Sequence, residues 1–145
     1  MSVTLAQANT ILIVALKKAR ETNFAPLTAV VLDAGGHVVA SQREDNCGIV
    51  RFELAFGKAW GSLGMGFGTR ELAERAAKAP AFVSALTAVS RGRAVPSPGG
   101  VLIRDAGGAV IGAVGISGDT GDNDEICAVA GIEAAGLKAQ VGAAS

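Results

Sequence analysis

Basic side chains on both sides of residue 50 could bind a small organic anion, and a thiol and an indole accompany them. The basic residues are Arg43, Arg51 and Lys58. Guanidinium and ammonium groups pair well with carboxylates, so these three are candidate ligand-binding residues. Cys47 and Trp60 are candidates for the apolar side of the same pocket. We expect the ligand near residues 43–51 and 117–125.

Carboxylates in the same segments could transfer protons instead. Asp45, Glu53 and Asp124 are candidates for a general acid or base. Arg51 or Lys58 would then stabilise a developing oxyanion. This reading describes a cofactor-free isomerase, lyase or hydrolase acting on a small organic acid or aldehyde. It stays open as an alternative to non-catalytic binding, because Lys58 could equally contact a neighbouring backbone, pair with Glu53 or be solvated.

The acidic segment GDTGDNDE, residues 118–125, offers oxygen ligands for a cation. It lacks the D-x-D-x-D-G spacing of a calcium loop, and acidic residues are favoured at helix N-termini in any case. We therefore predict no metal site. Cys127 follows in an early helical turn that could lower the pKa of a thiol. Its apolar neighbours favour a buried, inert residue instead.

The motif Asp-Ala-Gly-Gly occurs twice, at residues 33–36 and 105–108. A phosphate-binding loop leads from a strand into a helix N-terminus, whereas a strand-like run follows both copies. Aspartate and glycine also suit tight turns, so both copies are predicted to be hairpin turns. His37, the only histidine, follows the first turn. It is predicted to be solvated rather than a ligand of a metal or a haem.

Helical periodicity and turn residues indicate the elements that position these candidates. Thr4 and Gln7 form a capping box for a helix over residues 4–22. Apolar spacing from Phe52 to Leu63 predicts an amphipathic helix, which the GMGFG segment at 64–68 ends. Two further helices are predicted, one capped by Thr69 and one starting at Pro80.

Strand-like runs flank both Asp-Ala-Gly-Gly turns, at 27–33 and 37–43 and again at 101–105 and 109–117. A last helix is predicted at roughly 123–138, with Asp122 as its N-cap and Glu125 as capping-box partner. The order of elements predicts an α+β fold. We expect a single domain over residues 1–145, with a central antiparallel sheet built from two hairpins and helices packed on it.

Composition excludes several classes of partner. The chain has 13 Lys and Arg against 13 Asp and Glu, and five Phe, one Trp and no Tyr. Nucleic acid and anionic membranes attract basic proteins, so neither is expected as a partner. No apolar stretch reaches the ~20 residues of a membrane span and no signal peptide is evident, so we expect a cytoplasmic location. A mean hydropathy of +0.40 with 18% charged residues favours burial between identical subunits.

Several short motifs, taken in order, resemble the GlcG/HbpS-like family, which includes the C-terminal domain of PduO-type adenosyltransferases. The matching segments run from about residue 28 to 137: Arg43–Cys47, Ala55–Ala59, GGVLI (99–103), GAVGISG (112–118) and DEICAVAGI (124–132). The resemblance implies a profilin-like α/β sandwich, assembly into dimers through octamers, and an accessory small-molecule-binding role beside catabolic enzymes.

The resemblance also brings haem into consideration, because some members of the family bind it. We expect no cofactor here, since the only histidine is His37 and the match assigns it no ligand role. The chain departs from the family pattern at Asn46 and Cys47, where Gly-Ala is usual, and at Arg51, where Ser is common. These departures lie together, which implies a pocket adapted to a different ligand.

Overall fold

The computed structural model describes residues 1–144 as five helices and five strands. The helices are α1 (Leu5–Glu21), α2 (Arg51–Met65), α3 (Thr69–Lys78), α4 (Pro80–Val89) and α5 (Gly121–Ala134). The strands are β1 (Thr28–Asp33), β2 (Val38–Arg43), β3 (Gly100–Arg104), β4 (Val110–Ser117) and β5 (Lys138–Gln140). All strand pairs are antiparallel, in the order β2-β1-β4-β3-β5, so the predicted α+β class is confirmed.

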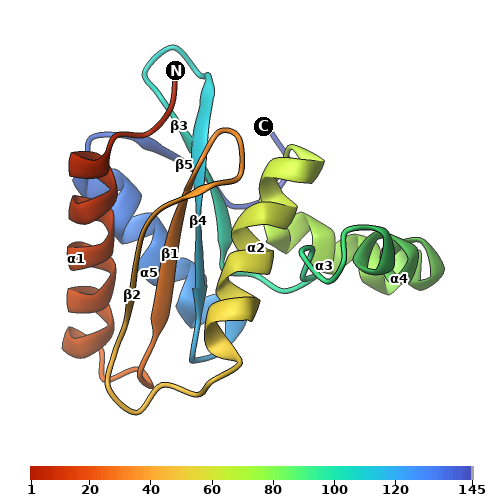
Figure 1. The fold of residues 1–145 in the computed structure, drawn as a ribbon, viewed down its shortest axis with the longest axis horizontal. Coiled ribbons are helices and arrows are strands. Elements are labelled where there is room, and N and C mark those ends of the chain that lie inside the picture. Colours follow the sequence, from red (N-terminus) through yellow and green to blue (C-terminus); the bar gives the residue numbers. More distant parts are fainter. Residues whose placement is uncertain (145) are drawn as a thin grey trace.

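Helices α1 and α5 cover one face of this sheet, and α2 covers the other (Figure 1). Alternate residues of β1 point to opposite faces, because side chains in a strand have a period of two. Ala29 and Val31 pack towards α1 and α5, whereas Val30 and Leu32 pack towards α2. The sheet is therefore buried on both sides, which explains why β1 and β4 are almost uniformly apolar.

The two Asp-Ala-Gly-Gly segments form hairpin turns, as predicted. Oδ1 of Asp33 accepts hydrogen bonds from the backbone N–H groups of Gly35 and His37, at 2.9 and 3.0 Å. Oδ1 of Asp105 accepts the N–H of Ala109 at 2.9 Å. Gly36 has a φ of +84°, the left-handed conformation that favours glycine.

The pairing of β1 with β4 decides which loops meet. Thr28 pairs with Ser117 at one end of the sheet, and Asp33 pairs with Gly112 at the other. Both hairpin turns therefore lie at the second end. The segments that follow β2 and β4, including residues 44–50 and 118–120, lie at the first end, together with the start of α2 (Figure 1).

The prediction for the last helix was wrong at both ends. Thr120, not Asp122, is the N-cap, and its hydroxyl accepts the N–H of Asn123 at 3.2 Å. The helix ends before Gly136, whose φ of +75° takes the chain out of the helical conformation. Strand β5 follows and pairs with β3. It was not predicted, because a short edge strand is defined by its partner strand and local periodicity does not reveal that partner.

Helix starts elsewhere largely follow the predicted signals. The Thr4–Gln7 capping box and the N-terminal Pro80 of α4 are confirmed. Thr69 is not an N-cap but the first residue of α3, after Gly68. Its hydroxyl instead bonds the backbone of Gly100. Among residues 1–144, no helix is both long and apolar enough to cross a membrane.

Candidate functional site

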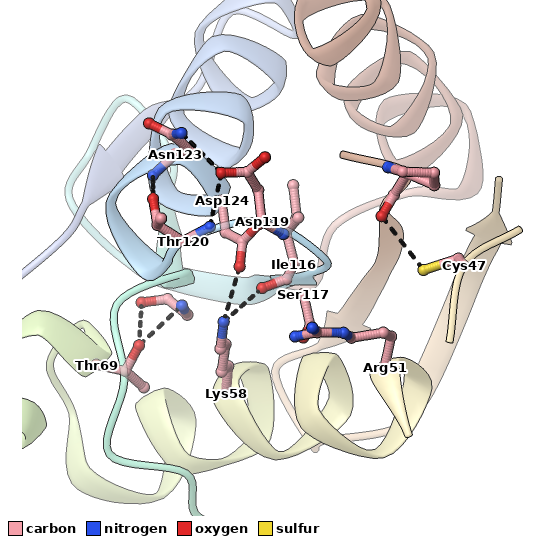
Figure 2. A network of polar contacts seen from close by, with 12 residues as sticks. Cys47, Arg51, Lys58, Thr69, Ile116, Ser117, Asp119, Thr120, Asn123 and Asp124 are labelled. Atoms are coloured by element: carbon pink, nitrogen blue, oxygen red, sulfur yellow. Dashed lines mark hydrogen bonds and ion pairs between the residues drawn. The ribbon is translucent and has the colours of Figure 1, made fainter. Parts of the chain in front are cut away.

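A buried ion pair joins α2 to the start of α5. Nζ of Lys58 donates to the carbonyl oxygen of Ile116 at 2.8 Å and to Oδ2 of Asp124 at 3.1 Å (Figure 2). Oδ1 of Asp124 accepts the N–H of Asp119 at 3.0 Å. Lys58 is 4% exposed and Asp124 is 1% exposed. The Lys58–Asp124 pair is thus enclosed, and each of its polar atoms has a hydrogen-bond partner.

Glycines let the backbone close around this pair. A Cβ on Gly99, whose φ is +120°, would lie 2.8 Å from the carbonyl oxygen of Ile116 and 3.0 Å from Nζ of Lys58. A Cβ on Gly115 would lie only 1.8 Å from the carbonyl oxygen of Ala55. Any side chain at either position would push α2 away from the sheet and separate the ammonium group from its partners.

Burial acts on both members of the Lys58–Asp124 pair. Desolvation lowers the pKa of Lys58 and raises the pKa of Asp124, and their mutual attraction opposes both changes. The guanidinium of Arg51 lowers the pKa of Lys58 further. Such a pair contributes geometry rather than much net stability, since desolvation offsets most of the Coulombic gain. Its structural effect is to hold α2, β4 and α5 at one end of the sheet.

The acidic segment 118–125 is occupied by internal contacts. Two hydrogen bonds from backbone N–H groups, those of Ala25 and Thr120, reach the Asp119 carboxylate at 2.7 Å and lower its pKa. The guanidinium of Arg70 on α3 pairs with the carboxylates of Asp122 and Glu125. Within residues 1–144, no three His, Cys, Asp or Glu side chains are arranged to hold a metal ion.

Arg51 and Cys47 contact two residues that are paired across the sheet. Nη1 of Arg51 donates to Oγ of Ser117 at 3.2 Å. Sγ of Cys47 accepts a hydrogen bond from the hydroxyl of Thr28 at 3.2 Å. It donates one to the carbonyl oxygen of Pro26 at 3.4 Å (Figure 2). Since Thr28 and Ser117 are neighbours on β1 and β4, the two functional groups share one end of the sheet.

The 44–50 loop around these groups combines a fixed base with exposed apolar residues. Glu44 anchors it through Nε of Arg20 at 2.9 Å and the N–H of Leu27 at 2.9 Å. A hollow of about 310 Å³ lies here, lined by Arg20, Pro26, Glu44, Asp45 and Asn46. Ile49 is 93% exposed, and Val50 and Phe52 are exposed beside it.

The structure gathers only some of the predicted site residues. Arg51, Cys47, Lys58 and Asp124 lie at this end of the sheet. The carboxylates of Asp45 and Glu53 are exposed and do not join the Lys58–Asp124 pair, so the alternative of a Lys58–Glu53 pair is wrong. Trp60 lies against Gly36 in the turn between β1 and β2, at the end of the sheet away from Arg51 and Cys47.

The other residues singled out in the sequence are either exposed to solvent or buried in the core. Arg43 is exposed at the end of β2, and the His37 side chain is 83% exposed, as predicted. Cys127 is fully buried, which confirms the prediction of a buried residue, and burial raises the pKa of its thiol to about 12. Ser117 and Arg70 were missed, and Asp119 was considered only as one carboxylate of the acidic segment 118–125. Only Asp119 carried a local signal, its position just before the N-cap of α5.

Comparison with known proteins identifies the family of this chain. The family model described as "Haem degrading protein HbpS-like" matches residues 3–133, nearly the whole chain. The chain belongs to the HbpS-like family. This confirms the resemblance found in the sequence motifs.

Individual proteins are similar to this chain over comparable lengths. A 15.0 kDa protein from the dhaT–dhaS intergenic region of Citrobacter freundii is 32% identical over 127 residues, which are 88% of this chain and 87% of that protein. The crystal structure of a PduOC:heme complex has a TM-score of 0.85 at 25% identity, covering 95% of this chain and 98% of that one. The HbpS structure has a TM-score of 0.78 at 28% identity, covering 92% and 89%.

Proposed function

We propose that this HbpS-like protein binds a small organic anion at the surface formed by the 44–50 loop and the start of α2, as a non-catalytic accessory protein. The observation that carries the proposal is the grouping of Arg51 and Cys47 beside the exposed Ile49, Val50 and Phe52. Cationic and apolar groups placed together suit a molecule that has a carboxylate and a short apolar body.

The guanidinium of Arg51 has further N–H donors that can bind such a ligand. Its side chain is half-buried and makes one hydrogen bond within residues 1–144, from Nη1 to Ser117. A guanidinium has five N–H donors in a fixed fork, which suits bidentate contact with a carboxylate. The Lys58–Asp124 pair fixes the helix that carries Arg51, so little ordering would accompany binding.

The same geometry argues for binding rather than catalysis. Lys58 and Asp124 are enclosed and already bonded to protein groups, so a reacting molecule has no access to them. Asp45 and Glu53 are exposed and are not paired with a second acid, base or oxyanion donor. General acid–base catalysis needs such a group within hydrogen-bond reach of the reacting atom.

Haem is the second candidate, because the family description names it and a PduOC:heme complex shares the fold. Haem iron takes His, Cys, Met or Tyr as axial ligand. His37 is exposed on a hairpin turn, and no histidine or cysteine lines the hollow under the 44–50 loop or the hollows beside Trp60. Met65 lines one of the hollows beside Trp60, but its volume of about 200 Å³ is below the roughly 300–1,000 Å³ of pockets for drug-sized ligands. These residues do not form a haem pocket within one chain. In this second candidate, haem binds through the exposed His37 at a contact between subunits.

Homo-oligomerisation forms part of the proposal. Large apolar side chains are exposed on several elements: Leu5 and Ile13 on α1, Phe82 on α4, and Ile126 on α5. Burial between subunits would remove this surface from water. Light scattering coupled to size exclusion should give a mass of at least two chains, and a monomer would contradict this part of the proposal.

Isothermal titration with acetate, lactate and succinate tests the ligand class. Arg51→Ala should weaken binding of the best probe at least tenfold, the effect of losing a charged hydrogen bond. Arg51→Lys should recover only part of it, because an ammonium lacks the fork. Lys17→Ala on α1 is the control. Unchanged affinity in Arg51→Ala would overturn the site.

A haem titration separates the second candidate from the first. Saturable growth of a Soret band in the wild-type protein, lost in His37→Ala but kept in Arg51→Ala, would support haem ligation through His37. No Soret shift, or one that His37→Ala leaves unchanged, would exclude it.

A further inference from the structure

A second hollow, about 200 Å³ in volume, lies between the last turns of α2 and α4. We name it the Trp60 hollow, because the indole of Trp60 forms one wall. Met65, Leu86 and Val89 supply further apolar walls, and Ser90 and Arg93 supply polar ones. It shares no residue with the hollow under the 44–50 loop. Its volume is below the roughly 300–1,000 Å³ of pockets for drug-sized ligands, so its occupant is smaller.

Arg93 gives the Trp60 hollow a positive charge at its edge. The guanidinium carbon lies 4.3 Å from the centroid of the Trp60 ring, and Nε donates to the carbonyl oxygen of Ser90 at 2.8 Å. These two contacts fix the plane of the guanidinium. Its terminal nitrogens have no hydrogen bond or ion pair within residues 1–144, and no acidic residue lines the hollow. A carboxylate can therefore approach both nitrogens.

Gly64 keeps the hollow open without a packing reason for being glycine. On the same helix, a Cβ on Gly57 would lie 2.6 Å from Val95, and one on Gly61 would lie 3.1 Å from the Cα of Ala94. A Cβ on Gly64 would meet only the Trp60 ring, at 3.6 Å, which is an ordinary contact. Glycine inside a helix costs about 0.5–1 kcal/mol relative to alanine. The structure thus gives up helix stability at Gly64, a position where a side chain would narrow the hollow.

Apolar surface at the mouth of the hollow remains exposed. Val89 is 79% exposed although it lies beside Leu86 and Met65, because α4 packs on α3 and leaves this side uncovered. In Figure 1, α3 and α4 extend away from the sheet. A ligand with an apolar body would cover Val89, while its charge stayed at the Arg93 edge.

We propose that the Trp60 hollow binds a small monocarboxylate with an apolar body, with the carboxylate paired to the terminal nitrogens of Arg93 and the body between Trp60, Met65 and Val89. A purely polar anion would leave the apolar walls of the hollow exposed to water, and a neutral molecule would leave the Arg93 guanidinium without an ion-pair partner. The two requirements together define the ligand class.

Trp60 reports on this site directly, because it is the only tryptophan of the chain. Titration with benzoate should change its fluorescence saturably, and hexanoate should do the same because the walls do not require an aromatic ring. Acetate lacks the apolar body and benzyl alcohol lacks the charge, so each should bind at least tenfold more weakly than benzoate.

Four variants sharpen the test with benzoate. Arg93→Gln should weaken binding at least tenfold, whereas Arg91→Gln, an exposed arginine that does not line the hollow, should stay within twofold. Val89→Asp should weaken binding more than Val89→Asn, because only the former adds charge repulsion at the mouth. Both Val89 variants lie on an exposed side chain, so they leave folding intact.

Three results would overturn the proposal. One is an unchanged Trp60 emission at millimolar benzoate. Another is equal weakening by Arg91→Gln and Arg93→Gln. The third is dissociation of an oligomer by Val89→Asp in the absence of ligand, since a second copy of the chain would then cover this face. Arg51→Ala should leave benzoate binding here unchanged, which separates this site from the one at the 44–50 loop.

Discussion

Replacing Lys58 by methionine tests how the Lys58–Asp124 pair holds the end of the sheet together. The substitution keeps a long apolar stem but removes the ammonium group, and so leaves the Asp124 carboxylate at 1% exposure without its counter-ion. The carbonyl oxygen of Ile116 loses its donor as well. Removing one partner of a buried ion pair costs about 3–5 kcal/mol. That is a large part of the ~5–15 kcal/mol that stabilises an ordinary domain.

A double-mutant cycle separates the pair from its surroundings. Asp124→Asn keeps an oxygen for the N–H of Asp119 and removes the negative charge. The double variant Lys58→Met/Asp124→Asn has no uncompensated charge. Its loss in the free energy of unfolding should therefore be smaller than the sum of the single losses, by about 2 kcal/mol.

Urea unfolding, followed by Trp60 fluorescence and circular dichroism, measures these free energies. Lys17→Met is the matched control: Lys17 lies 3.8 Å from Glu21 on α1, and both side chains are largely exposed. An exposed pair of this kind contributes about 0.3–0.5 kcal/mol. The reasoning fails if Lys58→Met costs no more than Lys17→Met, or if the two single losses simply add.

Three further outcomes are expected. Burial raises the pKa of Cys127 from 9.0 to about 12, so above pH 9 the folded chain keeps the thiol proton while the unfolded chain releases it. Between these two pKa values the free energy of unfolding should fall by about 1.4 kcal/mol per pH unit, and Cys127→Ala should remove this slope in urea titrations. A thiol reagent should modify Cys47 in the folded protein and Cys127 only after denaturation, and equal rates would contradict the burial of Cys127. Gly115→Ala should lower stability by about 1–3 kcal/mol or more in thermal unfolding, since its Cβ would lie 1.8 Å from a carbonyl oxygen, whereas Gly142→Ala, with open space around it, should change little.

Turn and cap chemistry made much of the fold predictable. The carboxylate of Asp33 bonds N–H groups two and four residues away, so the hairpin signal was complete within one short segment. The Thr4 capping box was equally local. The start of α5 was misjudged because Thr120 and Asp122 are both good caps. In the structure the Thr120 hydroxyl accepts the N–H of Asn123, whereas the Asp122 carboxylate pairs with Arg70.

The candidate site was less predictable, since its contacts depend on strand register. The sequence identified the loops near 43–51 and 117–125, and the pairing of Thr28 with Ser117 places them together. It could not tell that Trp60 lies at the other end of the hairpin. Trp60 is two residues from Lys58, a separation that places side chains on opposite sides of a helix.

The sequence by itself determined the α+β class, the two hairpins, most helix starts and the family, because these follow from periodicity and from contacts between residues a few positions apart. Only the tertiary structure decided the partner of Lys58, which is 66 residues away on α5, and the pairing of β5 with β3. It also decided that Arg93 lies over Trp60. These contacts arise when separate elements pack, and the close approach at Gly99 and Gly115 sets where α2 lies on the sheet.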